Sequence, residues 1–113
     1  MLPVIQLSSL DIWVDKLGNC ESHNDPNAYN PKDTDGTPSY GRFQFKIKTW
    51  IWLAKKYNLF DSRSWTHADF VKNIWDGQKQ EIVVHHMTTD PTINLRLQFP
   101  TCVKKLGLPV MKN

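Results

Sequence analysis

The residue best placed for acid–base chemistry in this chain is Glu21, which follows an apolar helical pattern. Four apolar residues upstream have the i, i+3, i+4, i+7 spacing of one helical face, and they are Leu10, Trp13, Val14 and Leu17. One further turn extends that face to Glu21, near the C-terminal end of the predicted helix. Burial and the negative end of a helix dipole both raise the pKa of a carboxyl group, as a general acid working near neutral pH requires.

The same residues also permit an ordinary surface glutamate. Helices commonly end at glycine, and a helix that ended at about Gly18 would leave Glu21 in the solvent. The periodicity alone favours this surface interpretation. The choice between the two therefore depends on the sequence downstream of Glu21.

Downstream, about twenty residues rich in turn formers lead to a compact motif at residues 39–45, which reads SYGRFQF. The ordered pieces are Glu21-Ser22, the turn-rich loop, Ser39-x-Gly41-x-x-Gln44-Phe45 and Thr49-Trp50. This order resembles the catalytic core of the lysozyme-like lytic transglycosylases, including the resuscitation-promoting-factor branch. The match covers about a quarter of the chain, with a weaker match at residues 101–107. With this pattern added, catalysis by Glu21 is the favoured interpretation.

The resemblance implies a substrate and a mechanism. The substrate would be peptidoglycan, cut at the β-1,4 bond between N-acetylmuramic acid and N-acetylglucosamine, with no cofactor. Glu21 would protonate the glycosidic oxygen and then take a proton from the muramyl C6 hydroxyl, giving a 1,6-anhydro end. Ser39 and Gln44 would line the groove, and Gly41 would let the backbone approach the substrate closely. Three aromatic residues are candidates either for groove walls or for the core, namely Tyr40, Phe45 and Trp50.

Two other functions stay open. A hydrolytic muramidase needs a second carboxylate to activate water, and Asp33 or Asp35 could supply it, although both also have ordinary reasons to lie in turns. A non-catalytic peptidoglycan-binding module, or a structural part of a phage tail, could share the same residues. The chain also departs from the family pattern: His23 stands where glycine is usual, and no Ala-Tyr-Asn-x-Gly segment is present. The missing segment favours the compact, resuscitation-factor-like branch of the family.

We expect a single domain over residues 1–113 with a mainly α, lysozyme-like α+β fold. The loop from Ser22 to Pro38 would dock as an ordered segment, with at most a short β-hairpin. The first predicted helix runs from Ser8 or Ser9 to about Gly18, and the second from about Lys48 to a stop at Asn58. A third starts at Thr66-x-x-Asp69 and breaks at Gly77, and a fourth runs from Gln78 to Met87. A helix start is also predicted at Asp90-Pro91, and a last helix from Thr101 to Leu106 before Gly107. Ile93, Leu95, Leu97 and Phe99 alternate as in a strand, which leaves that segment ambiguous.

The two cysteines, Cys20 and Cys102, can be a disulfide or two buried thiols. Resuscitation-promoting factors have a similar arrangement, and a cell-wall substrate implies an oxidising location. We therefore expect a disulfide, which would hold the last segment against the end of the first helix.

Composition and charge exclude several other classes. A net charge of +3 without a run of like charges indicates no nucleic-acid surface, and no apolar stretch is long enough to span a membrane. Residues 1–10 lack the features of a signal peptide, so the chain would be a domain of a longer secreted or anchored protein, or a phage-encoded enzyme exported by other means. Two further fragments, Asp33-x-Asp35-Gly36 and His85-His86 beside Asp90, lack the spacing of calcium or zinc sites, as does Cys20-x-x-His23, so no metal is expected. We expect a monomer.

Overall fold

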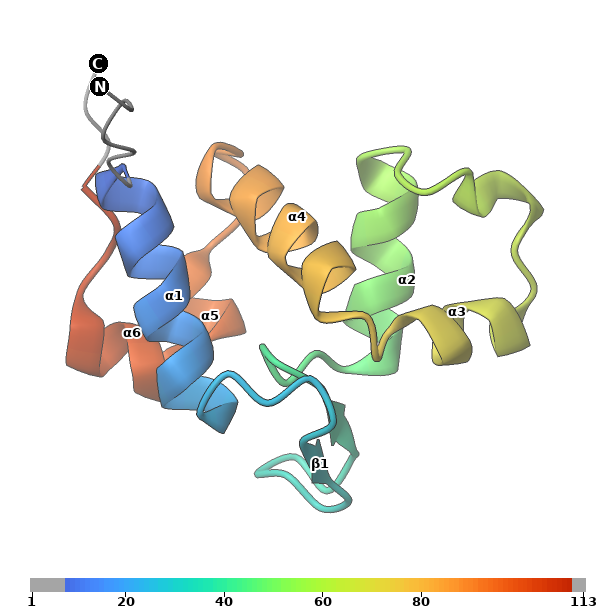
Figure 1. Cartoon of the computed structure of the whole chain (residues 1–113), viewed down its shortest axis with the longest axis horizontal. Helices are drawn as coiled ribbons and strands as arrows, with labels where there is room; N and C mark the ends of the chain where they lie inside the picture. Colours follow the sequence, from blue (N-terminus) through green and yellow to red (C-terminus); the bar gives the residue numbers. More distant parts are fainter. Residues whose placement is uncertain (1–7, 111–113) are drawn as a thin grey trace, which may run out of the picture.

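The computed structural model describes residues 8–110, and the protein is mainly helical, as the sequence predicts. In chain order the elements are α1 (Ser9–Ser22), β1 (Tyr29–Asn30), β2 (Ser39–Tyr40), α2 (Ile47–Lys56), the 3-10 helix η1 (Ser62–Ser64), α3 (His67–Asn73), α4 (Gly77–Thr88), α5 (Leu95–Gln98) and α6 (Pro100–Leu106). Helix α4 lies between a group formed by α1, α5 and α6 and a group formed by α2 and α3 (Figure 1). The signal-peptide prediction concerns residues 1–10, of which 1–7 lie outside the described residues.

Helix α1 begins as predicted and ends later than predicted. The hydroxyl of Ser8 caps the helix by accepting a hydrogen bond from the backbone N–H of Asp11. The Asp11 carboxylate in turn accepts from the backbone N–H of Ser8, so the two residues form a capping box. The expected end at about Gly18 is wrong, because α1 continues to Ser22 and ends at His23, whose φ is 56°. The helix therefore carries Glu21 in its last turn.

Close packing explains why α1 passes through Gly18. A Cβ atom at this position would lie 2.1 Å from Oδ1 of Asn24 and 3.2 Å from Nε of Arg42. The glycine hydrogen leaves room for the Asn24 side chain, which accepts a hydrogen bond from Arg42 Nε at 2.9 Å. Glycine at this position thus serves tertiary packing inside the helix and does not mark its end.

The predicted short hairpin is present: β1 lies within the loop from Ser22 to Pro38, and β2 directly follows it. Strands β1 and β2 pair antiparallel, with Tyr29 opposite Tyr40 and Asn30 opposite Ser39. The fully buried side chain of Gln80, on α4, holds the turn that follows β2. Its Oε1 accepts from the backbone N–H of Phe43 at 2.8 Å, and its Nε2 donates to the carbonyl of Tyr40 at 2.9 Å.

The middle helices follow the predicted signals. Helix α2 buries Trp50, Leu53 and Ala54, and the chain leaves it at Asn58 with a left-handed φ of 52°. The predicted capping box between Thr66 and Asp69 opens α3. The predicted break precedes α4, which begins at Gly77 with the Asp76 carboxylate as its cap. These predictions are confirmed, because each rests on a local backbone requirement that only a few residue types meet.

The C-terminal part differs from the prediction at one point. No helix begins at Asp90-Pro91, because the Asp90 carboxylate accepts from the backbone N–H and hydroxyl of Thr92 and closes a turn. The cap is instead Asn94, which opens α5, so the alternating apolar segment is a short helix and not a strand. Helix α6 then runs to Leu106 and ends at Gly107 as expected.

One hydrophobic cluster joins residues from α1, α2, α3, α4, α5 and α6. The indole Nε1 of Trp13 donates to the carbonyl of Gly107 at 3.0 Å and so fastens the end of α6 to α1. Within residues 8–110 no helix is long and apolar enough to cross a membrane.

Candidate active site

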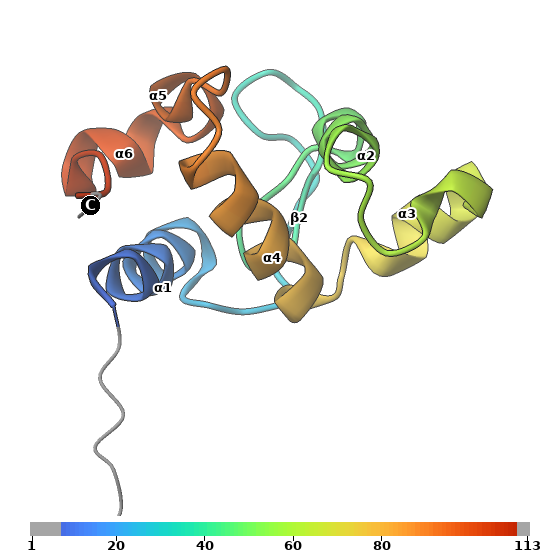
Figure 2. The same ribbon diagram turned by 90° about the horizontal axis from the view of Figure 1, so that it is seen from above.

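Glu21 lies half-buried in a pocket of about 270 Å³, between the loop that follows β1 and the C-terminal helices. Figure 2 shows that this loop and α5 lie on the same side of the molecule. One side of the pocket consists of Asp33, Thr34, Asp35 and Lys46, which we call the loop wall. The other side consists of residues 97–101, from α5 and the start of α6, which we call the C-terminal wall. Two walls far apart in sequence therefore enclose one carboxylate.

The pKa of Glu21 is raised to about 7. Burial is the main cause, since it disfavours the charged carboxylate, and the negative charge of Asp33 adds to it. Among residues 8–110, none forms a hydrogen bond or an ion pair with the Glu21 carboxyl group. A carboxyl group that is protonated near neutral pH and not held by other protein groups can give its proton to a ligand.

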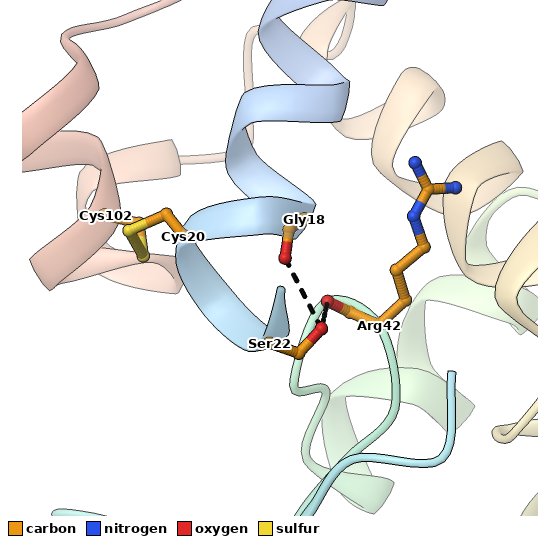
Figure 3. The surroundings of a disulfide bond; sticks show 5 residues. All are labelled: Gly18, Cys20, Ser22, Arg42 and Cys102. Atoms are coloured by element: carbon orange, nitrogen blue, oxygen red, sulfur yellow. Dashed lines mark hydrogen bonds between the residues drawn. A yellow bond between two sulfur atoms is a disulfide. The ribbon is translucent and has the colours of Figure 1, made fainter. Parts of the chain in front are cut away.

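The neighbours of Glu21 in sequence fix its position. Cys20 forms a disulfide with Cys102 of α6, with 5.9 Å between their Cα atoms, so the predicted bond is confirmed (Figure 3). On the other side, the hydroxyl of Ser22 donates to the carbonyl of Arg42 at 2.7 Å and accepts from the backbone N–H of Asp25 at 3.1 Å. Three consecutive residues thus supply a covalent tie to α6, the pocket carboxyl group and a tie to the turn after β2.

Charged groups hold the loop wall together. Nζ of Lys46 lies 2.9 Å from Oδ1 of Asp35 and 3.5 Å from Oδ2 of Asp33, and it donates to the carbonyl of Thr37 at 2.7 Å. The hydroxyl of Ser39, fully buried, donates to Oδ2 of Asp33 at 2.6 Å. This bond is the main cause of the lowered pKa of Asp33, and bonds from Thr37 and then Lys46 lower the pKa of Asp35.

The C-terminal wall is less polar. Phe99 is buried, Pro100 opens α6, and Leu97 is 72% exposed although it is a large apolar residue. Cys102 follows directly, so the disulfide ties this wall to the residue before Glu21.

Of the substrate-binding residues expected from the sequence, only Gln44 and Phe45 line the pocket with Glu21. Nε2 of Gln44 donates to the carbonyl of Gly41 at 3.0 Å and stabilises its own turn, where Gln44 has a φ of 54°. Phe45 is 3% exposed and also belongs to the core.

The other four expected residues lie outside the pocket lining. Ser39 is buried against Asp33, Trp50 is in the core, and Gly41, with a φ of 77°, packs against the Gln80 amide, 2.6 Å from where a Cβ would lie. Tyr40 contacts the rings of Tyr29 and Trp75, with centroid separations of 5.3 and 5.4 Å. These residues shape the hairpin that supports the loop wall.

Sequence reasoning missed Lys46 and most of the C-terminal wall. Lys46 directly follows the motif at residues 39–45, and its position near two aspartates of a turn-rich loop was an available signal. Residues 97–100 carried no signal, because nothing local connects them to Glu21.

The described residues offer no candidate metal centre, since residues 8–110 contain no group of three or more His, Cys, Asp or Glu side chains that could hold an ion. The sulfur atoms of Cys20 and Cys102 are bonded to each other. The loop aspartates make hydrogen bonds within their own turns instead, as Asp35 does with the backbone N–H of Thr37 at 2.9 Å.

No protein-family model matches the chain, and neither the curated proteins nor the solved structures include a significant match to it.

Proposed function

We propose that this protein is a lysozyme-like lytic transglycosylase that cleaves peptidoglycan, with Glu21 as its general acid and base. The observation that carries the proposal is the Glu21 carboxyl group, half-buried in a pocket with a pKa of about 7. The order of motif residues around it supports the substrate class. The disulfide fits an oxidising compartment outside the cytoplasm, where peptidoglycan lies.

The reaction needs one carboxyl group. Protonated Glu21 gives its proton to the glycosidic oxygen as the bond between that oxygen and C1 of N-acetylmuramic acid breaks. The resulting carboxylate then takes the proton of the C6 hydroxyl as this oxygen bonds to C1. The products are a free hydroxyl on one sugar and a 1,6-anhydro ring on the other, and Glu21 regains its proton. No water is consumed.

The loop wall bears on the choice between transglycosylase and hydrolase. A hydrolase needs a base to activate water, and the strength of a general base falls as its pKa falls. The carboxylates of Asp33 and Asp35 both accept strong hydrogen bonds that lower their pKa. They are therefore poor bases, and this supports the transglycosylase.

A hydrolytic muramidase remains the second candidate, because Asp33 lines the same pocket as Glu21. Its charge contributes to the raised pKa of Glu21, so the two carboxyl groups interact. An inverting hydrolase would use this pair as acid and base.

The first test is Glu21→Gln, compared with Glu81→Gln. Gln cannot exchange the proton, so we expect the rate of cell-wall lysis to fall by about 10² to 10⁴ while the fold is kept. Glu81, 39% exposed and 3.3 Å from Arg42, is the only other glutamate in the chain and provides the matched control. Zymography on cell walls and circular dichroism measure lysis and folding. Wall lysis by folded Glu21→Gln at the wild-type rate would refute the assignment.

Mass spectrometry of the products separates the candidates. A transglycosylase releases fragments lighter by one water than those of a hydrolase, with anhydro-muramyl ends. Fragments that all carry reducing ends would favour the muramidase with Asp33. Binding to cell walls without any lysis by the wild-type protein would instead favour a non-catalytic module.

A further inference from the structure

Leu97 is the most exposed of the large apolar side chains among residues 8–110, with 72% of its surface accessible. A single exposed leucine is common on protein surfaces and by itself indicates nothing. This one, however, lies in the C-terminal wall of the pocket that holds Glu21. It thus presents an apolar surface to whatever ligand enters the pocket.

The loop wall is polar throughout, whereas the C-terminal wall combines polar and apolar residues. Asp33, Asp35 and Lys46 present charged and hydrogen-bonding groups on the loop side. The C-terminal side also contains the polar residues Gln98 and Thr101, but its large exposed apolar side chain is Leu97, since Phe99 is only 4% exposed. A ligand that fits between the loop wall and Leu97 has hydroxyl groups on one face and an apolar substituent on the other. An acylated amino sugar has this form, because its ring hydroxyls are polar and its acyl group ends in a methyl.

We propose that Leu97 is a substrate-binding residue that covers a methyl group on a substituent of the sugar ring, and this proposal rests on the proposed function. Two kinds of methyl group occur in peptidoglycan: that of the N-acetyl group, which both sugars carry, and that of the ether-linked lactyl group of N-acetylmuramic acid. Both offer the same chemistry to Leu97, and the substrates below distinguish them.

A structural role does not account for Leu97. Truncation of a side chain that is 72% exposed leaves no buried cavity, so stability depends little on it. The bond that caps α5 runs from the backbone N–H of Leu97 to Asn94 Oδ1 at 3.2 Å, and an alanine keeps it. Leu97→Ala should therefore melt within about 4 °C of the wild type, which corresponds to about 0.5 kcal/mol.

The test is the dependence of the initial rate on the concentration of soluble glycan strands freed of their peptides. For Leu97→Ala we expect the half-saturating concentration to rise about tenfold, the loss typical of an apolar contact in a substrate pocket. The maximal rate should change less than about twofold, since the contact is made equally in ground and transition states. Leu97→Met, which keeps an apolar side chain, should restore most of the binding.

The matched control is Leu108→Ala, which removes the same side chain from an exposed site (41%) outside the Glu21 pocket. It should leave both kinetic parameters unchanged. Strands from which the N-acetyl groups have been removed identify the methyl group. If the difference between wild type and Leu97→Ala disappears on them, Leu97 contacts the N-acetyl methyl; if it persists, Leu97 contacts the lactyl methyl.

An active wild-type enzyme with an unchanged half-saturating concentration in Leu97→Ala would overturn the inference and leave the proposed function standing. A fall in maximal rate alone would also overturn it, because that result assigns Leu97 to positioning Glu21. A wild-type protein that cleaves no strand would overturn the proposed function itself.

Discussion

The two walls of the Glu21 pocket are held in place by opposite means. The loop wall depends on ion pairs among side chains that keep contact with water: Lys46 is 27% exposed, Asp33 31% and Asp35 57%. The C-terminal wall depends on buried apolar contacts of Phe99 and Val103 and on the covalent bond between Cys102 and Cys20. One wall is therefore sensitive to charge and salt, and the other to the redox state.

This difference separates two tasks within one site. Exposed ion pairs contribute little to stability, so the loop wall can rearrange around a ligand at small cost. The C-terminal wall moves only with α6, which the disulfide and the bond from Trp13 to Gly107 hold against α1. The rigid wall and Glu21 thus form one unit.

The largest expected effect comes from breaking the covalent tie. Replacing both cysteines, as Cys20→Ser with Cys102→Ser, should lower the free energy of unfolding by about 4 kcal/mol, because the bond closes a long loop in the unfolded chain. At temperatures below the melting point, the rate of cell-wall cleavage should fall by about 10 to 100-fold. Displacement of the C-terminal side of the pocket, near the reacting atoms, costs this much. Denaturant unfolding and lysis assays measure the two effects.

Reduced wild-type protein provides the control for the serine side chains. It should match the double variant in stability and in rate. If the protein without the bond keeps the wild-type melting temperature and rate, the C-terminal wall does not depend on the disulfide.

A smaller effect is expected from Asp33→Asn, which removes a charge from the loop wall. Wild-type activity should fall as the pH rises through about 7, because Glu21 loses the proton that it must donate. The charge of Asp33 raises the pKa of Glu21, so its removal lowers this pKa and moves the alkaline fall to lower pH. The rate at pH 5 should stay within about tenfold of the wild type.

Measurement of the rate from pH 4 to 9 checks both statements. Loss of activity by about 10² to 10⁴ at every pH, in a folded protein, would make Asp33 the base of a hydrolase. Asparagine can still accept the bond from Ser39, so such a loss would not follow from a disordered loop.

The smallest effect is expected from Lys46→Met. Exposed ion pairs are worth about 0 to 1 kcal/mol, so the free energy of unfolding should fall by less than about 1 kcal/mol. The rate of lysis should fall by less than about fivefold, which corresponds to the same energy. Raising the salt concentration to about 1 M should reduce the difference from the wild type, because salt screens the Lys46 ion pairs that only the wild type has.

Lys79→Met is the matched control for that change. Lys79 is 30% exposed and lies 3.0 Å from Asp76 at the start of α4, so it loses a similar ion pair outside the Glu21 pocket. It should leave the rate unchanged. An equal loss of rate in both variants would show that the effect of Lys46→Met is not specific to the Glu21 pocket.

The sequence by itself determined the local features of this protein. Residues such as Ser8, Thr66 and Asn58 fix helix ends through one hydrogen bond or one backbone angle, so their roles are readable without a fold. The spacing of the apolar residues before Glu21 likewise predicted the buried face of the first helix, whereas by periodicity alone Glu21 itself was interpreted as a surface residue. The residues alone left Cys20 and Cys102 open between a disulfide and two buried thiols, and the resemblance to resuscitation-promoting factors favoured the disulfide.

Only the tertiary structure decided which groups surround Glu21. Local propensity favoured a helix end at Gly18, and the packing of Asn24 and Arg42 against that residue overrode it. Ser39 reads as a groove residue in the motif, yet its burial against Asp33 gives it a supporting role. Leu97 is distant from Glu21 in sequence, and its place in the pocket follows from α6 packing on α1. Contacts of this kind depend on the whole chain, because no local hydrogen bond or periodicity encodes them.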